Sequence, residues 1–146
     1  MRIAMWSGPR NLSTAMMYAF AARGDCAVVD EPFYAAYLAR TGLDHPMRDA
    51  ILAAQPQDPS AVVAGLLGPV PAQKPLFYQK HMAQHMIPGI PRDWVREVVN
   101  VFLIRHPRAS PPAFPPNTTT RRLPISALSS RPNFTSIWWP RGNRRW

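Results

Sequence analysis

The chain has 146 residues and a formal net charge of +9, with 17 Lys and Arg residues against 8 Asp and Glu residues. This length suits one modest domain. The single cysteine cannot form an internal disulfide, and no apolar run approaches the roughly 20 residues that span a bilayer, so a disulfide-stapled secreted scaffold and a membrane span are both excluded. We therefore expect a cytoplasmic protein.

The positive charge is concentrated near the carboxyl terminus. Basic and acidic residues nearly balance through Ile104, whereas residues 109–146 contain no Asp or Glu and are rich in Pro, Ser, Thr and Arg, without a helical or strand period. This composition predicts disorder, and a frameshifted end would produce the same abrupt change. We divide the chain into a domain over residues 1–108 and a basic tail over residues 109–146. Because the charge belongs to the tail, we predict no specific nucleic-acid binding.

The chain begins with the pattern of a parallel α/β unit. Residues 2–6 read as a short buried strand, and residues 12–23 carry apolar side chains at helical spacing. Gly24 is a natural helix stop, and residues 26–29 are a second apolar, β-branched run. Strand, loop, helix and strand in this order predict a parallel sheet with flanking helices, in which ligands bind at the carboxyl ends of strands.

The loop of this unit has the composition of an oxyanion-binding turn. Gly8 and Pro9 permit a tight turn, and Arg10 supplies a planar cation. Ser13 and Thr14 place hydroxyl groups where the following helix exposes unpaired N–H groups. An ordinary helix start capped by a hydroxyl residue is the structural alternative.

The nucleotide triphosphate loop is a poor match to this segment. That loop needs a second glycine and a lysine before its hydroxyl residue, whereas this chain has Leu12 near the second glycine position and no lysine between Gly8 and Thr14. The chain also offers no clear carboxylate for magnesium. A nucleotide kinase is therefore the less favoured alternative.

A second phosphate signal lies at residues 98–108, which read V-V-N-V-F-L-I-R-H-P-R. This β-rich run ends in Arg105, whose guanidinium suits a phosphate through two parallel hydrogen bonds. An arginine at a strand end on the surface is the alternative. His106 is a weaker candidate beside it.

Together, the loop and the Arg-x-Pro strand resemble the 5′-phosphosulfate loop and the 3′-phosphate strand of the sulfotransferase family. The resemblance implies a three-layer α/β/α, P-loop-like parallel sheet, with an irregular carboxyl-terminal tail here. It implies 3′-phosphoadenosine 5′-phosphosulfate (PAPS) as sulfuryl donor, a small-molecule acceptor with a hydroxyl or amine, and no metal. The cofactor-binding positions it implies are Pro9, Arg10, Asn11, Leu12, Ser13, Thr14 and Arg105.

The resemblance covers about the first hundred residues and leaves the carboxyl-terminal part of the family fold unaccounted for. The family places a serine eight residues after the phosphate-binding arginine, and Ala113 stands there in this chain. A noncatalytic, truncated remnant of the fold is therefore a second hypothesis.

Sulfuryl transfer needs a base that accepts the acceptor's proton. Glu31, in the D-E-P-F-Y segment after the second strand, is the first candidate, and some sulfotransferases use a glutamate in this context. The structural alternative makes Asp30 and Glu31 a helix N-cap pair before Pro32. The aromatic residues that follow, Phe33, Tyr34 and Tyr37, line an acceptor pocket or pack a helix onto the sheet.

His81 is the second candidate for the base. Residues 76–79 read as a third strand, and we expect His81 and His85, four residues apart, to share one helix face after it. A zinc site is disfavoured because a third ligand and the usual glutamate are missing. Lys80 or His81 contacts the phosphosulfate or the acceptor, or else begins a solvated helix.

Two further helices complete the expected domain. Residues 44–54 form one, and residues 60–67 form the other, with Asp58 and Pro59 as its start signal.

Overall fold

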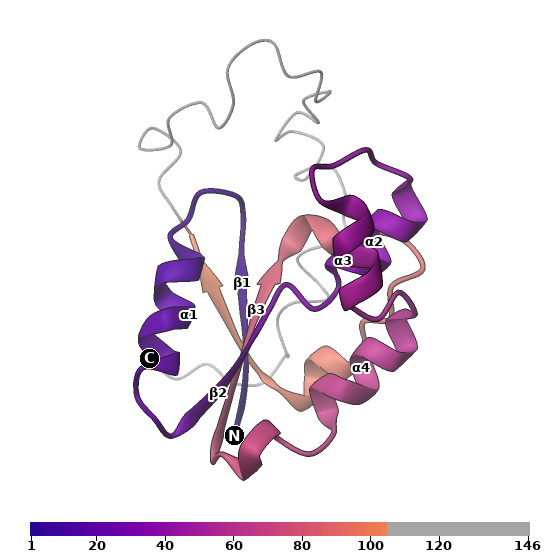
Figure 1. Cartoon of the computed structure of the whole chain (residues 1–146). Helices are drawn as coiled ribbons and strands as arrows, with labels where there is room; N and C mark the ends of the chain where they lie inside the picture. The colour runs from indigo at the N-terminus through magenta and orange to yellow at the C-terminus, as the bar shows by residue number, and fades with distance from the viewer. Residues whose placement is uncertain (105–146) are drawn as a thin grey trace. The chain divides into compact units, whose positions relative to one another are not determined.

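The structure is a computed structural model that describes residues 1–104 (Figure 1). Arg105, His106 and the proposed tail over residues 109–146 lie outside the described residues, as does the expected boundary at residue 108. The strands and α-helices are β1 Arg2–Ser7, α1 Ser13–Ala21, β2 Cys26–Asp30, α2 Tyr34–Thr41, α3 Arg48–Ala54, α4 Pro59–Leu67, β3 Leu76–Met82 and β4 Val99–Leu103. Short 3-10 helices span Pro71–Gln73, Ala83–His85 and Asp93–Glu97.

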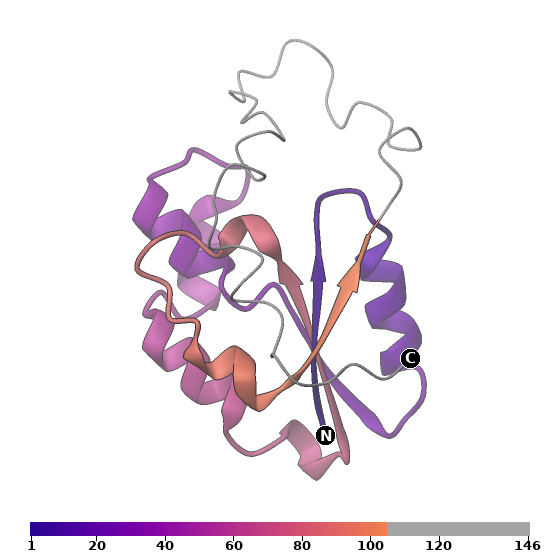
Figure 2. The same ribbon diagram turned by 180° about the vertical axis from the view of Figure 1, so that it is seen from behind.

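The four strands form one parallel sheet in the order β2-β3-β1-β4. Helix α1 lies on one side of this sheet and α2, α3 and α4 lie on the other, in both views (Figures 1 and 2). The three-layer α/β/α fold with a parallel sheet is therefore confirmed. Because all strands run the same way, their carboxyl ends lie at one edge, where the loop after β1 also begins.

The period of two along the strands divides the core between the two faces of the sheet. Ile3, Met5 and Tyr78 pack with Met17 of α1 on one face. The opposite face carries Trp6, which is 1% exposed. Neighbouring residues on one strand therefore place their side chains on opposite faces of the sheet. This alternation determines which face each candidate functional side chain occupies.

Local signals explain where the helices begin. Asp58 caps α4, since its carboxylate accepts hydrogen bonds from the N–H groups of Ser60 and Ala61, with proline at the first helical position. Helix α3 begins at Arg48, four residues later than expected, because Met47 before it has a φ of 65°. Pro46 also disfavours helical backbone at the residue that precedes it.

The expected helix that carries His81 and His85 is wrong. Strand β3 continues through His81 to Met82, paired with β1 up to Ser7, and His85 lies in the 3-10 helix that follows. Lys80 and His81 therefore face opposite sides of the sheet. Parallel pairing with strands on both sides outweighs the local helical spacing, because it satisfies the backbone groups of a buried segment.

Within residues 1–104, no helix is long and apolar enough to cross a membrane.

Candidate functional site

The loop after β1 connects the centre of the sheet to the amino terminus of α1. Arg10 and Leu12 have φ angles of 63° and 57°, so the backbone turns twice through the left-handed region. Asn11 Nδ2 donates a hydrogen bond to the Leu103 carbonyl oxygen at 3.0 Å, which ties the loop to the last residue of β4. Pro9, Arg10, Leu12 and Thr14 are exposed and Ser13 is buried.

The amino terminus of α1 suits an anion. Its N-cap residue is Leu12, no side chain makes a capping hydrogen bond there, and its first turn contains no acidic residue. The expected alternative of a hydroxyl-capped helix start is therefore wrong, since Ser13 is already the first helical residue. An uncapped helix start presents N–H groups and the positive end of the helix dipole to a ligand.

A buried lysine organises the neighbouring strand end. Lys80 on β3 is 3% exposed. Its Nζ donates to Asp30 Oδ1 at 2.7 Å and to Glu31 Oε1 at 2.6 Å. Burial by itself lowers the pKa of Lys80. The hydrogen bonds with the two carboxylates, and their charges, raise it by more than burial lowers it, so the pKa lies above its usual value. The lysine is therefore a fixed cation at this edge of the sheet.

Glu31 is positioned by its backbone as well as by this ion pair. Its φ of 44° is left-handed, its N–H donates to the Lys80 carbonyl at 2.9 Å, and its own carbonyl accepts from the Tyr34 N–H at 2.9 Å. Neither Asp30 nor Glu31 caps α2, whose N-cap is Phe33 without a side-chain hydrogen bond. The N-cap alternative is wrong, and the Glu31 side chain is 24% exposed.

His85 lies behind Glu31. Its Nε2 is 4.0 Å from Glu31 Oε2, and its ring stacks against Tyr34 and Tyr37 at centroid distances of 4.8 and 4.9 Å. Burial, and secondarily the charge of Lys80, lowers the pKa of His85 to about 4. The ring is therefore neutral at neutral pH. Tyr34 and Tyr37 pack against this histidine, and Phe33 is a core residue at 1% exposure.

His81 lies in the core on the other face of the sheet. Its ring is 2% exposed and stacks on Trp6 at a centroid distance of 4.5 Å, with Nε2 3.4 Å from Gln79 Oε1. Burial, and secondarily the charge of His85, lowers the pKa of His81 to about 3. The structure thus brings Glu31 and Lys80 together and separates His81 from them.

Sequence reasoning missed the contacts of His85 with Glu31 and the two tyrosines. These contacts join the residue after β2, helix α2 and the segment after β3, so no local spacing indicates them. Arg105 lies outside the described residues, but β4 ends at Leu103 beside Ser7, in register with β1. Among residues 1–104, no three or more His, Cys, Asp or Glu side chains form a group that could hold a metal ion.

Replacing Lys80 by Met should lower the free energy of unfolding by about 2 kcal/mol. The methionine keeps much of the apolar stem but leaves Asp30 and Glu31 without their shared cation, and both carboxylates retain some solvent, which moderates the cost. Urea unfolding at pH 7 measures the loss. Lys74→Met, which removes an exposed hydrogen bond to the Gly24 carbonyl, is the control and should cost less. Equal stability of the wild type and Lys80→Met would contradict this role.

Comparison with known families gives the class of protein that this fold and site define. Residues 1–114 match the family described as sulfotransferase domain. The chain belongs to this family, and the assignment suggested by the loop and the Arg-x-Pro strand is confirmed.

Two relatives from Arabidopsis thaliana are similar to this chain. Branched-chain-amino-acid aminotransferase-like protein 2 is 39% identical to this chain, and branched-chain-amino-acid aminotransferase-like protein 1 is 38% identical. Each match extends over 112 residues, which are 77% of this chain and 20% of the relative. The chain thus spans about a fifth of the length of the curated relatives it matches. No solved structure matches the chain significantly.

Proposed function

We propose that this domain transfers a sulfuryl group from PAPS to the hydroxyl or amine of a small-molecule acceptor. The observation that carries the proposal is the placement of two complementary groups at the carboxyl edge of one parallel sheet. The uncapped start of α1 suits the donor's phosphate groups, and Glu31, held by Lys80, suits a proton acceptor. Family membership supports this class of reaction.

The residues divide the chemistry between them. PAPS supplies a sulfuryl group on a phosphate leaving group when it is bound. The Pro9 to Thr14 loop binds the 5′-phosphate through the N–H groups of α1 and the Arg10 guanidinium, and Arg105 is assigned to the 3′-phosphate. Glu31 accepts a proton from the hydroxyl or amine of the acceptor while the acceptor's oxygen or nitrogen bonds to sulfur. The bond between sulfur and the phosphate oxygen breaks, and the loop stabilises the negative charge left on the phosphate.

The proposal assigns the base to Glu31 and not to His81. Glu31 is partly exposed at the strand edge, whereas His81 is 2% exposed and stacked on Trp6. Lys80, next to Glu31, keeps a positive charge near the reacting groups. The proposed reaction uses no metal, and we propose that it takes place in the cytoplasm.

Arg10→Ala should weaken binding of 3′-phosphoadenosine 5′-phosphate by about 1.5–3 kcal/mol, because it removes a charged hydrogen bond to phosphate. Calorimetric titration measures the loss, with ATP and magnesium as the comparison ligand. Arg23→Ala, beyond the other end of α1 and ion-paired with Asp25, is the matched control and should bind normally. Unchanged affinity in Arg10→Ala would remove Arg10 from the phosphate site.

A noncatalytic remnant of the sulfotransferase fold is the second candidate. It rests on Ala113, which replaces the serine that the family pattern places eight residues after Arg105. This candidate predicts that the folded chain binds the bisphosphate nucleotide weakly or not at all and transfers no sulfuryl group to any acceptor in a panel of phenols, alcohols and amines.

A further inference from the structure

The two oxygens of the Glu31 carboxylate have different neighbours. Oε1 accepts a hydrogen bond from Lys80 Nζ at 2.6 Å, whereas Oε2 lies 4.0 Å from Nε2 of His85. The lysine belongs to β3 and the histidine to the 3-10 helix that follows it, so one short stretch of chain reaches both oxygens. Contacts at both oxygens fix the plane of a carboxylate, which a contact at one oxygen leaves free to rotate.

The ring of His85 is itself held in place. It is 2% exposed, and it stacks against Tyr34 at an interplanar angle of 3° and against Tyr37 at 29°. Both tyrosines belong to α2, which begins at Tyr34, shortly after Glu31. The helix that follows Glu31 therefore holds the histidine that faces its carboxylate.

The surroundings of this ring indicate which nitrogen carries the proton. Nδ1 of His85 is buried and has no hydrogen-bond partner among the described residues, whereas Nε2 faces a carboxylate. A neutral imidazole has one N–H, and its position is set by the acceptor that the nitrogen can reach. The expected tautomer therefore has its proton on Nε2, directed toward Glu31 Oε2.

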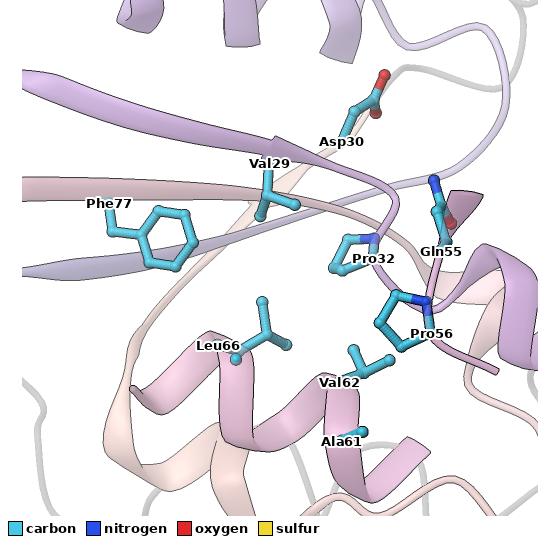
Figure 3. A pocket seen from close by; sticks show the side chains of 10 residues that line it. Val29, Asp30, Pro32, Gln55, Pro56, Ala61, Val62, Leu66 and Phe77 are labelled. Carbon is cyan, nitrogen blue, oxygen red and sulfur yellow. The ribbon is translucent and has the colours of Figure 1, made fainter. Parts of the chain in front are cut away.

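Packing around the Glu31 backbone is incomplete on one side. Asp30 and Pro32, its neighbours in the chain, line a pocket of about 240 Å³ whose walls include Val62 and Leu66 of α4 (Figure 3). This hollow gives the segment no close-packed support on that side. Contacts with the side chain of Glu31 therefore have to fix the position of its carboxylate.

We propose that His85 is a positioning residue, which orients the Glu31 carboxylate together with Lys80. Lys80 holds Oε1 and the Nε2–H of His85 holds Oε2, so the base keeps one orientation when it takes the acceptor's proton. A separation of 4.0 Å is longer than a hydrogen bond, and catalytic contacts are often long until substrate binds and shortens them. The catalytic part of this role rests on the proposed function, in which Glu31 is the base, whereas the contact itself does not.

The contact is tested without any assay of transfer, by proton–nitrogen correlation NMR of the histidine rings in the 146-residue chain. His85→Phe identifies the His85 signals by their loss. The wild type should show a slowly exchanging proton on Nε2, and Glu31→Ala should move this signal upfield, because the anion that accepts the proton is gone. Glu97→Ala, at an exposed glutamate, is the matched control and should leave the signal unchanged. Absence of this proton in the wild type, or the same signal in Glu31→Ala, would overturn the proposal.

The second test separates the nitrogen atom from the ring. His85→Phe keeps an aromatic ring against the two tyrosines but removes the N–H, so kcat for transfer should fall about tenfold. KM for the acceptor and the affinity for 3′-phosphoadenosine 5′-phosphate should stay unchanged. His85→Gln, which returns an N–H near the position of Nε2, should recover part of the loss. His81→Phe, whose ring stacks on Trp6 on the other face of the sheet, is the matched control and should transfer at the wild-type rate.

A double variant shows whether His85 acts through Glu31. In a chain that already carries Glu31→Gln, His85→Phe should cost little further activity, because the base that it positions is gone. Losses that multiply, or an unchanged kcat in His85→Phe, would overturn the positioning role. If the wild-type chain transferred no sulfuryl group, the proposed function would fail, and the NMR comparison would still decide whether His85 holds the carboxylate.

Discussion

Glu31→Gln is expected to lower sulfuryl transfer by about 100-fold or more while leaving nucleotide binding nearly intact. The amide keeps the shape of the side chain and a partner for Lys80, but it no longer accepts a proton from the acceptor. The measurement is transfer of labelled sulfate from PAPS to the acceptor panel, with bisphosphate affinity determined on the same sample. A loss confined to transfer is the result that a base predicts and that a purely structural residue does not.

Glu97→Gln is the matched control, since Glu97 is an exposed glutamate at the end of a 3-10 helix. It should transfer at the wild-type rate. If Glu31→Gln also retained full activity, the base would have to be sought elsewhere, and His81→Asn would be the next variant because His81 is the other residue that the sequence indicated. If both functions were lost together, the ion pair with Lys80 would be essential to the site as a whole.

The first βαβ unit was predictable from the sequence because its signals are local. Two short apolar runs, a helical period and Gly24 mark β1, α1 and β2 to within a few residues. The cap formed by Asp58 and Pro59 likewise depends on neighbours in the chain. Patterns of this kind report backbone preferences that tertiary packing did not need to override.

The predictions that failed concern segments whose structure depends on contacts with distant parts of the chain. Lys80 to His85 has the spacing of a helix, but pairing of β3 with β1 and β2 makes its first half a strand. The same pairing register decides that Lys80 reaches Asp30 and Glu31 whereas His81 enters the core. A one-residue change of register would exchange these two environments, and no single sequence reveals the register.

The free energy of unfolding is expected to fall by several kcal/mol between pH 6.5 and pH 4. In the folded chain the pKa of His85 is lowered to about 4 and that of His81 to about 3, whereas an unfolded histidine titrates near 6.5. Within this window the unfolded chain binds protons that the folded chain does not, so stability present above pH 6.5 is lost as the pH falls. At 1.36 kcal/mol per pH unit, His85 alone accounts for roughly 3 kcal/mol.

The groups around the two rings explain the direction of this effect. The ring of His85 stacks against Tyr34 and Tyr37. The charge of Lys80 disfavours a charged ring, and the carboxylate of Glu31, 4.0 Å from Nε2, favours one. The aromatic stack of His81 on Trp6 offers no compensating anion. Protonation of His81 therefore places an uncompensated charge in the core, and protonation of His85 places one there that only Glu31 offsets in part. In both cases the cost depends mainly on burial.

The phenylalanine variants isolate this contribution. His85→Phe keeps an aromatic ring against the two tyrosines, and His81→Phe keeps one against Trp6, but neither replacement titrates. In urea unfolding at a series of pH values from 8 to 4, each variant should show a shallower loss of stability than the wild type, and the double variant should be the least sensitive to acid. Carboxylates titrate in all four proteins, so differences in slope report the histidines alone. Parallel curves for the wild type and the double variant would show that the two rings take up protons equally in the folded and unfolded chains. That result would contradict the lowered pKa values of His81 and His85 in the folded chain.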